Sequence, residues 1–223
     1  SGLPLYCLAI FDNQQGALSR MVSRRIGPRR YSESSIFGDI DSDGDLDIIA
    51  TYSKEGTTVV YKNDDGRFDE GTVVYRDPAV QHCQRIYCVD IDQDASMELF
   101  CAKGPWGPPG QSVALAQQPG SSTMKVVWRS SPNTGFHGFD FRDVDGDGDL
   151  DMAAADWSGR SVSVFLQHDG MLATAPVWIA KTRAPVHEVH FGDVDGDGDL
   201  DLAAGRSEER RVGYEGGGGG GGG

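Results

Sequence analysis

An acidic segment recurs four times along the chain at almost constant spacing. The four copies read FGDIDSDGDLDII from Phe37, CVDIDQDASMELF from Cys88, FRDVDGDGDLDMA from Phe141 and FGDVDGDGDLDLA from Phe191. Their first aspartates, Asp39, Asp90, Asp143 and Asp193, are 51, 53 and 50 residues apart. This period fits a four-stranded repeat unit and is too long for ankyrin or tetratricopeptide repeats. We therefore expect a series of similar units that are stable only when packed against their neighbours.

Each period has the pattern of four short strands separated by turns. In the first complete period the expected strands are 35–38, 47–51, 57–63 and 71–76, with the acidic segment between the first two and Asp64-Asp65-Gly66 between the last two. The third period repeats this order, with strands 162–167 and 176–180 around Asp169-Gly170. Helical periodicity is absent. The sequence predicts an all-β fold, a β-propeller of four-stranded antiparallel blades.

The repeat also sets the expected domain boundaries. Complete blades are predicted at 31–79, 80–134 and 135–184, and a partial blade at 185–205. A further partial blade at 1–30 would hold a third strand at 5–13 and a fourth strand at 17–24. The chain is expected to begin inside one blade and to end inside another.

The last residues, 206–223, differ from the rest of the chain. They read RSEERRVGYE followed by eight glycines. Glycine loses the most backbone entropy on ordering, so no packed element is expected here. The letters RSEERRVG resemble the translation of a sequencing adapter, which predicts a non-native tail. A flexible linker is the alternative.

Oxygen donors alternate along each acidic segment. Counted from the first aspartate, carboxylates stand at positions one, three, five, seven and nine, and position six is glycine. This alternation points carboxylates at one centre, and the glycine lets the position-seven carbonyl face the same centre. Oxygen ligands without His or Cys favour Ca²⁺ or Mg²⁺ over zinc, and six to eight ligands on a flexible loop favour Ca²⁺. The predicted ligands are Asp39, Asp41, Asp43, Asp45 and Asp47 in the loop 39–47, Asp143, Asp145, Asp147, Asp149 and Asp151 in 143–151, and Asp193, Asp195, Asp197, Asp199 and Asp201 in 193–201.

The second segment, 90–98, departs from this pattern. Asp90, Asp92 and Asp94 are present, but Ala95 replaces the glycine and Glu98 replaces the ninth-position aspartate. Alanine resists positive φ and glutamate reaches differently, so binding is expected to be weaker or lost. Three to four structural Ca²⁺ ions are therefore predicted.

Three alternatives fit the acidic segments less well than calcium loops between strands. Solvated Asp/Gly turns need only one or two such residues, whereas the four segments hold 19 of the 34 acidic residues. An EF-hand needs Glu at position twelve and flanking helices, and a dockerin module needs a following helix, but an apolar strand-like run stands there instead. Calcium loops between strands remain the prediction.

Composition limits the partners and the compartment. A net charge of −14 does not suit a nucleic-acid binder, and no apolar run approaches the length of a membrane span. The chain opens at Ser1 without a signal-peptide pattern, so the natural N-terminus is expected upstream. The four cysteines, Cys7, Cys83, Cys88 and Cys101, lack the spacing of a zinc site. A Cys88–Cys101 disulfide and two buried thiols are both consistent with the sequence.

The Phe-Gly or Phe-Arg pair before DxDxDGDxD, the apolar strand after it and the period of about 50 residues resemble the FG-GAP or VCBS repeats of integrin α-subunit propellers and of many secreted microbial proteins. The resemblance covers 3–205. It implies a seven-bladed ring, of which the chain would be a fragment, a structural role for calcium and an extracellular or cell-surface location. It does not imply an activity, because propellers host lectins, adhesins, lyases and scaffolds.

The expected ligand surface is the rim opposite the calcium loops, because connections between second and third strands share that face. That rim holds residues that could line a site for a sugar or a peptide, since exposed aromatic residues stack on sugars and anchor interfaces: Tyr52, Trp106, Trp157, His137 and His187. His137, His187 and His190 lie in no recognisable catalytic pattern, so no catalytic residue is predicted. The leading hypothesis is a module that recognises a glycan or a protein. The alternatives are a domain of a polysaccharide-degrading or lyase-like enzyme, and a spacer without its own ligand.

Overall fold

The computed structural model describes residues 8–28, 31–77, 83–106, 110–132 and 134–205. Within these residues the fold is all-β, with a single 3₁₀ turn at Ser53–Glu55. None of the described segments forms a helix that is long and apolar enough to cross a membrane. Cys7 and the predicted tail 206–223 lie outside the described residues.

Three antiparallel four-stranded sheets form the body of the molecule, and in each the strands pair in chain order. The first holds β5 (Ser34–Gly38), β6 (Asp47–Tyr52), β7 (Thr57–Tyr61) and β10 (Thr72–Arg76). The second holds β11 (Arg85–Val89), β12 (Glu98–Ala102), β13 (Val113–Gln117) and β14 (Met124–Arg129). The third holds β15 (Phe136–Arg142), β16 (Asp151–Asp156), β17 (Ser161–Phe165) and β20 (Trp178–Lys181).

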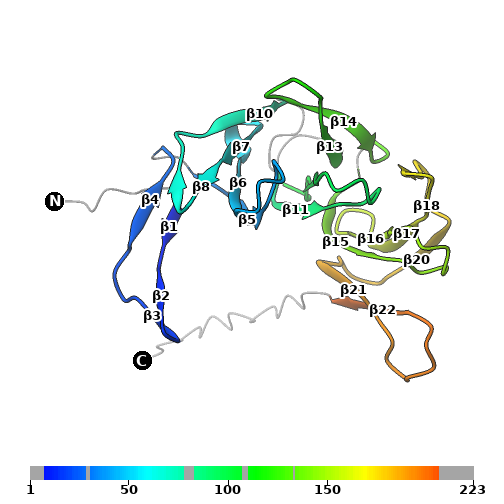
Figure 1. Ribbon diagram of the computed structural model, residues 1–223. Coiled ribbons are helices and arrows are strands. Elements are labelled where there is room, and N and C mark those ends of the chain that lie inside the picture. Colours follow the sequence, from blue (N-terminus) through cyan, green and yellow to red (C-terminus); the bar gives the residue numbers. More distant parts are fainter. Residues whose placement is uncertain (1–7, 29–30, 78–82, 107–109, 133, 206–223) are drawn as a thin grey trace, which may run out of the picture.

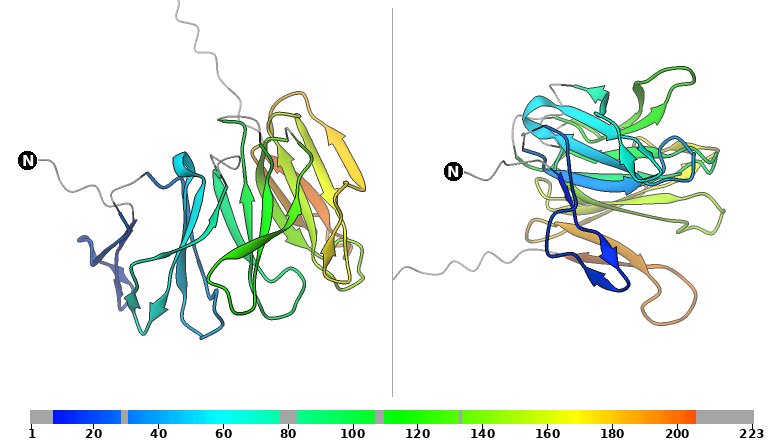
Figure 2. Two further views of the ribbon diagram at one scale, coloured as in Figure 1. Left: turned by 90° about the horizontal axis from the view of Figure 1, so that it is seen from above. Right: turned by 60° about the vertical axis from the view of Figure 1, so that its left-hand side comes forward.

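Two-stranded sheets flank these three, and each resembles half of a four-stranded unit. On one side β1 (Leu8–Ile10) pairs with β4 (Arg24–Ile26), and on the other β21 (Glu188–Gly192) pairs with β22 (Asp201–Gly205). The five sheets follow one another along an arc (Figure 1), and the view from above shows them side by side (Figure 2). The predicted all-β fold with four-stranded antiparallel sheets is confirmed.

Small hairpins extend the connection between the third and fourth strands. They are β2 (Asn13–Gln14) with β3 (Ala17–Leu18), β8 (Asn63–Asp64) with β9 (Arg67–Phe68), and β18 (Gln167–His168) with β19 (Met171–Leu172). In each, a residue with positive φ precedes a glycine with positive φ, as at Asp65 (49°) and Gly66 (80°). Such a pair of dihedral angles matches the twist of a two-residue hairpin turn.

The first hairpin corrects the expected boundaries of the opening unit. A fourth strand was predicted at 17–24, but Ala17–Leu18 belongs to the hairpin and the paired strand is Arg24–Ile26. The turn at Gln15-Gly16 explains the shift, because it closes a hairpin that lengthens the connection by several residues.

The core lies between the sheets, and both faces of each central strand are buried. In β6, Ile48 and Ala50 pack toward the first two-stranded sheet, whereas Ile49 packs toward the second four-stranded sheet. All six residues of β6 are buried, because alternate side chains enter two different clusters. This double burial explains why the second strand of each complete unit reads as a continuous apolar run rather than as an alternating one.

Neighbouring sheets approach most closely along their first strands. A Cβ added to Gly38 would come within 2.5 Å of Cys88 Sγ, so only glycine fits there. Backbone N–H groups of one first strand donate to side chains of the preceding one, from Ile86 to Ser34 Oγ (3.3 Å) and from Phe191 to Asp140 Oδ2 (2.7 Å). These contacts fix the register between repeat units as well as within them.

Cys83, Cys88 and Cys101 are free thiols, so the Cys88–Cys101 disulfide that the sequence left open does not form. The strand register gives the reason. Cys88 stands opposite Leu99 and Cys101 stands opposite Ile86, so the two cysteines are displaced by two residues along the pair. Burial raises the pKa of the Cys88 thiol to about 11.

Candidate functional site

The acidic segments form the connections between the first and second strands of four successive units. They join β5 to β6, β11 to β12, β15 to β16 and β21 to β22. All four therefore lie at the same end of the sheets, and we call them the first to fourth acidic loops. The predicted position of the loops in the units is confirmed.

The position-one aspartate organises the backbone of each loop. Asp39 accepts hydrogen bonds from the N–H groups of Asp43 (3.1 Å) and Gly44 (2.9 Å). Asp90 accepts the equivalent bonds from Asp94 and Ala95, both 3.0 Å. In the other two loops Asp143 and Asp193 accept the N–H of the position-six glycine at 2.9 and 3.1 Å. One carboxylate thus closes the turn in every copy.

Two positions of each loop have positive φ, of which the sequence predicted only one. Position six has φ of 95° at Gly44 and 97° at Gly148, as expected. Position four also turns this way, with φ of 59° at Ser42 and 78° at Gly146. In the regular loops the glycine at position six signals a positive φ there. Position four carries Ser, Gln or Gly, so the sequence signal for a positive φ at that position is weak.

The position-nine carboxylate connects three parts of the repeat unit. Asp47 accepts the N–H of Ile40 through Oδ2 (3.1 Å) and the N–H of Asn63, beyond the third strand, through Oδ1 (2.8 Å). Asp151 does the same with Val144 and Gln167, both at 2.9 Å. Burial raises the pKa of both carboxyl groups, against the lowering effect of these hydrogen bonds. The sequence predicted these residues as ligands but did not predict this second role.

The position-seven side chains point toward the neighbouring hairpin turn. Asp45 Oδ2 accepts the N–H of Asp65 (2.8 Å), and Asp149 Oδ2 accepts the N–H of Asp169 (3.1 Å). The predicted ligand at position seven is a backbone carbonyl, which this arrangement leaves available.

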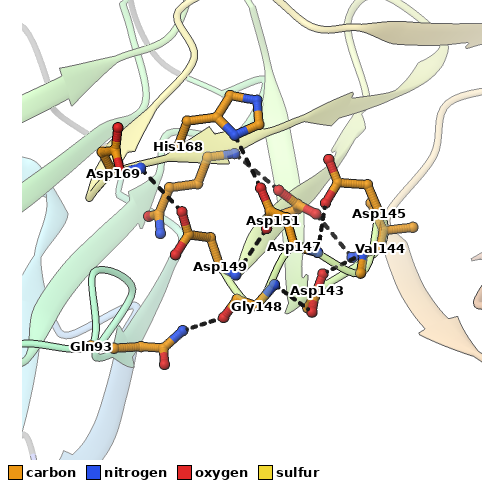
Figure 3. A network of polar contacts seen from close by, with 12 residues as sticks. Gln93, Asp143, Val144, Asp145, Asp147, Gly148, Asp149, Asp151, His168 and Asp169 are labelled. Atoms are coloured by element: carbon orange, nitrogen blue, oxygen red, sulfur yellow. Dashed lines mark hydrogen bonds and ion pairs between the residues drawn. The ribbon is translucent and has the colours of Figure 1, made fainter.

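A lysine and a histidine contact two of the loops. Each comes from the connection between the third and fourth strands of its unit. Lys62 Nζ donates to Asp41 Oδ2 (2.6 Å), and this hydrogen bond raises the pKa of the lysine. His168 Nδ1 lies 3.0 Å from Asp147 Oδ2 in the third loop, as Figure 3 shows. The hydrogen bond from the Asp149 N–H has the largest effect and lowers the pKa of Asp147. The contact with His168 lowers it further. Neither contact was predicted from the sequence.

Adjacent loops also contact one another. Ser42 Oγ donates to the carbonyl of Ala95 (3.2 Å), and Gln93 Nε2 donates to the carbonyl of Gly148 (2.7 Å), which Figure 3 includes. In both cases the position-four side chain of one loop bonds to position six of the next. Such contacts align the first three loops as a row.

The donor set of each loop fits a hard divalent cation. In each loop, carboxylate oxygens of three residues lie within 4.8 Å of one another: Asp39, Asp41 and Asp43; Asp90, Asp92 and Asp94; Asp143, Asp145 and Asp151; and Asp193, Asp195 and Asp197. In the third loop, a ring nitrogen of His168 lies equally close to carboxylate oxygens of Asp145 and Asp147. Oxygen donors in this number and spacing match the preferences of Ca²⁺ and Mg²⁺.

The comparison with protein families matches this geometry. The model of the FG-GAP-like repeat matches residues 39–101 and 143–204. The chain belongs to the FG-GAP-like repeat family. Each match begins at position one of an acidic loop and ends in the second strand of the following FG-GAP-like unit. No curated protein matches the chain.

The second FG-GAP-like loop keeps the backbone of the others despite its substitutions. Ala95 adopts φ of 69° where the other loops have glycine, and Glu98 Oε2 accepts the Ile91 N–H at 3.2 Å as Asp47 accepts that of Ile40. Burial and the charges of Asp92 and Asp94 raise the pKa of Glu98 to about 7. The substitutions therefore change the strain and the charge of this loop rather than its course.

The predicted ligand-binding aromatic residues separate into two groups. Tyr52 is only 2% exposed and its hydroxyl lies 2.6 Å from that of Tyr61, so its prediction as a surface contact was wrong. Strand β6 continues through Tyr52 and turns this side chain into the core. Trp106 is 50% exposed and lies against Trp157, with ring centroids 5.4 Å apart. Both belong to second-to-third strand connections, at the end opposite the acidic loops.

The three histidines of the sequence analysis do not form one group. His137 is buried, and its Nδ1 lies 3.1 Å from the carbonyl of His187. Burial lowers the pKa of both His137 and His187. His190 is exposed on β21. The structure brings His137 and His187 beside Trp106 and Trp157, on the rim where the sequence placed these four residues.

Proposed function

We propose that the chain is a calcium-binding recognition module, built from FG-GAP-like units that form blades of a β-propeller. The observation that carries the proposal is the oxygen-only cluster repeated in all four acidic loops. Carboxylates this close repel one another, and a divalent cation would offset this repulsion. Four Ca²⁺ ions would change the net charge of −14 to −6.

Calcium would act structurally in this proposal. Asp39 accepts a backbone N–H within the loop, and Asp47 accepts the N–H groups of Ile40 in the loop and of Asn63 beyond the third strand. An ion held by these carboxylates would therefore also stabilise the attached strands. A dissociation constant of about 10⁻⁴ M would suit extracellular calcium levels. We therefore place the module outside the cell or at its surface.

The propeller arrangement is supported by the close approach of successive first strands. Gly38 lies against Cys88, the Phe139 N–H donates to the Tyr87 hydroxyl, and the Phe191 N–H donates to Asp140, so each first strand contacts the next one along the chain. In a propeller the first strand of each blade lines the central axis, and we propose a seven-bladed ring. Class averages of the intact parent protein by electron microscopy test this proposal, and an open solenoid would contradict it.

A melting experiment tests the calcium role. The full chain is heated in about 2 mM Ca²⁺, in about 2 mM Mg²⁺ and in excess chelator. Each filled site with a dissociation constant of about 10⁻⁴ M contributes about 1.8 kcal/mol to stability. We expect a clear rise of the melting temperature in Ca²⁺ and a smaller one in Mg²⁺. Equal melting temperatures in Ca²⁺ and in chelator would contradict the proposal.

The module would recognise a glycan or a protein without catalysing a reaction. The support is the exposed Trp106 at the end remote from the metal loops, because large exposed aromatic residues serve as anchors in binding surfaces. Binding of a glycan or protein by the full chain, without turnover of a bound polysaccharide, would agree with this role. Turnover that depends on the chain would favour the enzyme-associated alternative.

A further inference from the structure

Four rings meet at the end of the sheets opposite the acidic loops. Trp106 lies in the β12–β13 connection, His137 at the start of β15, Trp157 in the β16–β17 turn and His187 just before β21. The ring centroid of His187 is 4.1 Å from that of Trp157 and 4.6 Å from that of His137. None of the four rings belongs to the core clusters of the described residues. Three successive units thus assemble one aromatic surface.

The exposed ring of this surface is held in place by its own loop. Trp106 is 50% exposed, and its carbonyl accepts a hydrogen bond of 2.8 Å from Lys103 Nζ. Lys103 is itself buried, so this bond is shielded from water. Gly104 N–H donates to the carbonyl of Phe136 on the next sheet at 2.7 Å. A ligand would meet a preformed aromatic face, which lowers the entropic cost of binding.

The turn that carries Trp157 is equally restrained. The Trp157 N–H donates to the carbonyl of Gly135 (3.0 Å). The buried carboxylate of Asp156 accepts the N–H groups of Gly135 (3.1 Å) and Gly159 (2.9 Å). A Cβ at Gly159 would lie 2.2 Å from Asp156 Oδ2, so a side chain there would displace the carboxylate that holds the turn. The two tryptophan loops therefore keep their relative positions.

Positive charges surround this turn. Arg160, Lys181 and Arg183 are exposed, and among the described residues none of them forms an ion pair. They lie together, because the Thr182 N–H donates to the Arg160 carbonyl (2.8 Å) and Lys181 Nζ approaches the Gly159 carbonyl (3.4 Å). The chain as a whole carries −14, so a cationic surface at this end is a local reversal of sign.

The chemistry of the surface narrows the class of ligand. The Trp106 and Trp157 centroids are only 5.4 Å apart, so no cation fits between the rings. An exposed tryptophan face instead suits the apolar C–H face of a sugar ring. Unpaired guanidinium and ammonium groups suit carboxylate or sulfate. We propose that Trp106, Trp157, Arg160, Lys181 and Arg183 form a binding site for an acidic saccharide, a uronate or a sulfated sugar. This inference rests on the recognition function proposed above.

The test uses the full chain in about 2 mM Ca²⁺ on an array of oligosaccharides. The array holds uronate and sulfated oligosaccharides beside neutral ones of the same backbone, including hexagalacturonate and its methyl ester. We expect binding to uronate, sulfated or both panels, and weaker binding as the salt concentration rises, because exposed charges are screened. Binding that is equal for each acidic sugar and its neutral counterpart would overturn the proposal.

Variants then locate the site by titration with the strongest acidic sugar of the array. Trp106→Ala should weaken binding at least tenfold, as expected for an aromatic anchor, and Arg160→Gln about fivefold. Trp178→Ala is the matched control for the tryptophan, because Trp178 is 48% exposed and lies at the opposite end of β20 from Lys181. Lys125→Gln is the control for the charge, since Lys125 lies beside the acidic loops.

Calcium uptake is measured on every variant and separates this proposal from the proposed function. A chain that takes up calcium but binds no sugar contradicts the acidic-saccharide site and leaves the calcium role standing. If Trp178→Ala weakens sugar binding as much as Trp106→Ala does, the proposed location of the saccharide site is contradicted, but the recognition function is not. A chain that binds an immobilised protein and no acidic sugar also overturns the proposal.

Discussion

The first and second acidic loops follow the same backbone course with different residues. The first has Gly44 and Asp47 where the second has Ala95 and Glu98, and both loops are closed by hydrogen bonds to the position-one aspartate. The difference shows that the turn is specified by this aspartate and by the strand pairing, not by the glycine. Glycine and the ninth-position aspartate instead set how much strain and how much uncompensated charge the loop carries.

The largest difference in stability between variants of the two loops should come from replacing the position-nine residue. Asp47→Ala leaves the buried N–H of Ile40 and the half-buried N–H of Asn63 without an acceptor. We expect a loss of about 3 kcal/mol in the free energy of unfolding, since each unsatisfied group costs about 1–3 kcal/mol. Glu98→Ala removes one bond to the backbone, that from Ile91, and should cost about half as much. Urea unfolding in chelator measures both, and an equal or larger loss for Glu98→Ala would contradict the comparison.

Removal of a ligand from a regular loop should affect calcium more than the same change in the second loop. Asp145→Ala and Asp195→Ala are expected to abolish about 1.8 kcal/mol of calcium-dependent stability each. Asp92→Ala should have a smaller effect, because the second loop, with Ala95 and Glu98, is itself expected to bind calcium more weakly. Calorimetric titration of the three variants gives the order. The comparison fails if Asp92→Ala loses as much calcium affinity as Asp145→Ala.

Exchange of the position-six residues should change stability in opposite directions. Gly44→Ala places a side chain at φ of 95°, and because nothing lies within 4 Å of the added Cβ, the cost is conformational, about 1 kcal/mol. Ala95→Gly relieves φ of 69° and should stabilise by up to about 1 kcal/mol. Thermal melting in chelator checks the signs. A loss of stability in Ala95→Gly would show that this loop is not strained.

The smallest expected effect is a pH dependence of the calcium-free second loop near neutral pH. The pKa of Glu98 is raised from 4.5 to about 7, so the folded state favours the protonated carboxyl. This contribution is fully present below pH 4.5 and is lost as the pH rises through 7. The native chain should therefore lose stability relative to Glu98→Gln as the pH rises through 7. Chelator melts of Glu98→Gln and the native chain from pH 5 to 8 should diverge, and parallel curves would contradict this expectation.

Much of this fold is readable from the sequence because the repeat unit is short and strongly patterned. The acidic loops mark the first strand connection, and the Asp-Gly turns at Asp65 and Asp169 mark the third. The hairpin before Arg24 was misplaced because a Gln-Gly turn gives a weaker signal. Seven blades, calcium and an extracellular location remain predictions.

The site was predicted in part, and the failures have a common cause. The carboxylates of positions one, three and five are close together in the first, second and fourth loops, because local alternation places them, whereas the third loop joins positions one, three and nine. Contacts that depend on tertiary packing were missed, such as Gln93 to Gly148 and Lys62 to Asp41. Tyr52 was misassigned for the same reason, since one added residue of strand decides whether a side chain faces the core.

The number of calcium ions bound by the full chain tests the central claim most directly. Equilibrium dialysis against calcium from about 10 μM to 5 mM, with magnesium as the competitor, counts them without reference to stability. The oxygen clusters of the acidic loops predict three tightly bound ions and a fourth, weaker ion in the second loop. A chain that binds no calcium, or only a single ion, under these conditions would contradict the account.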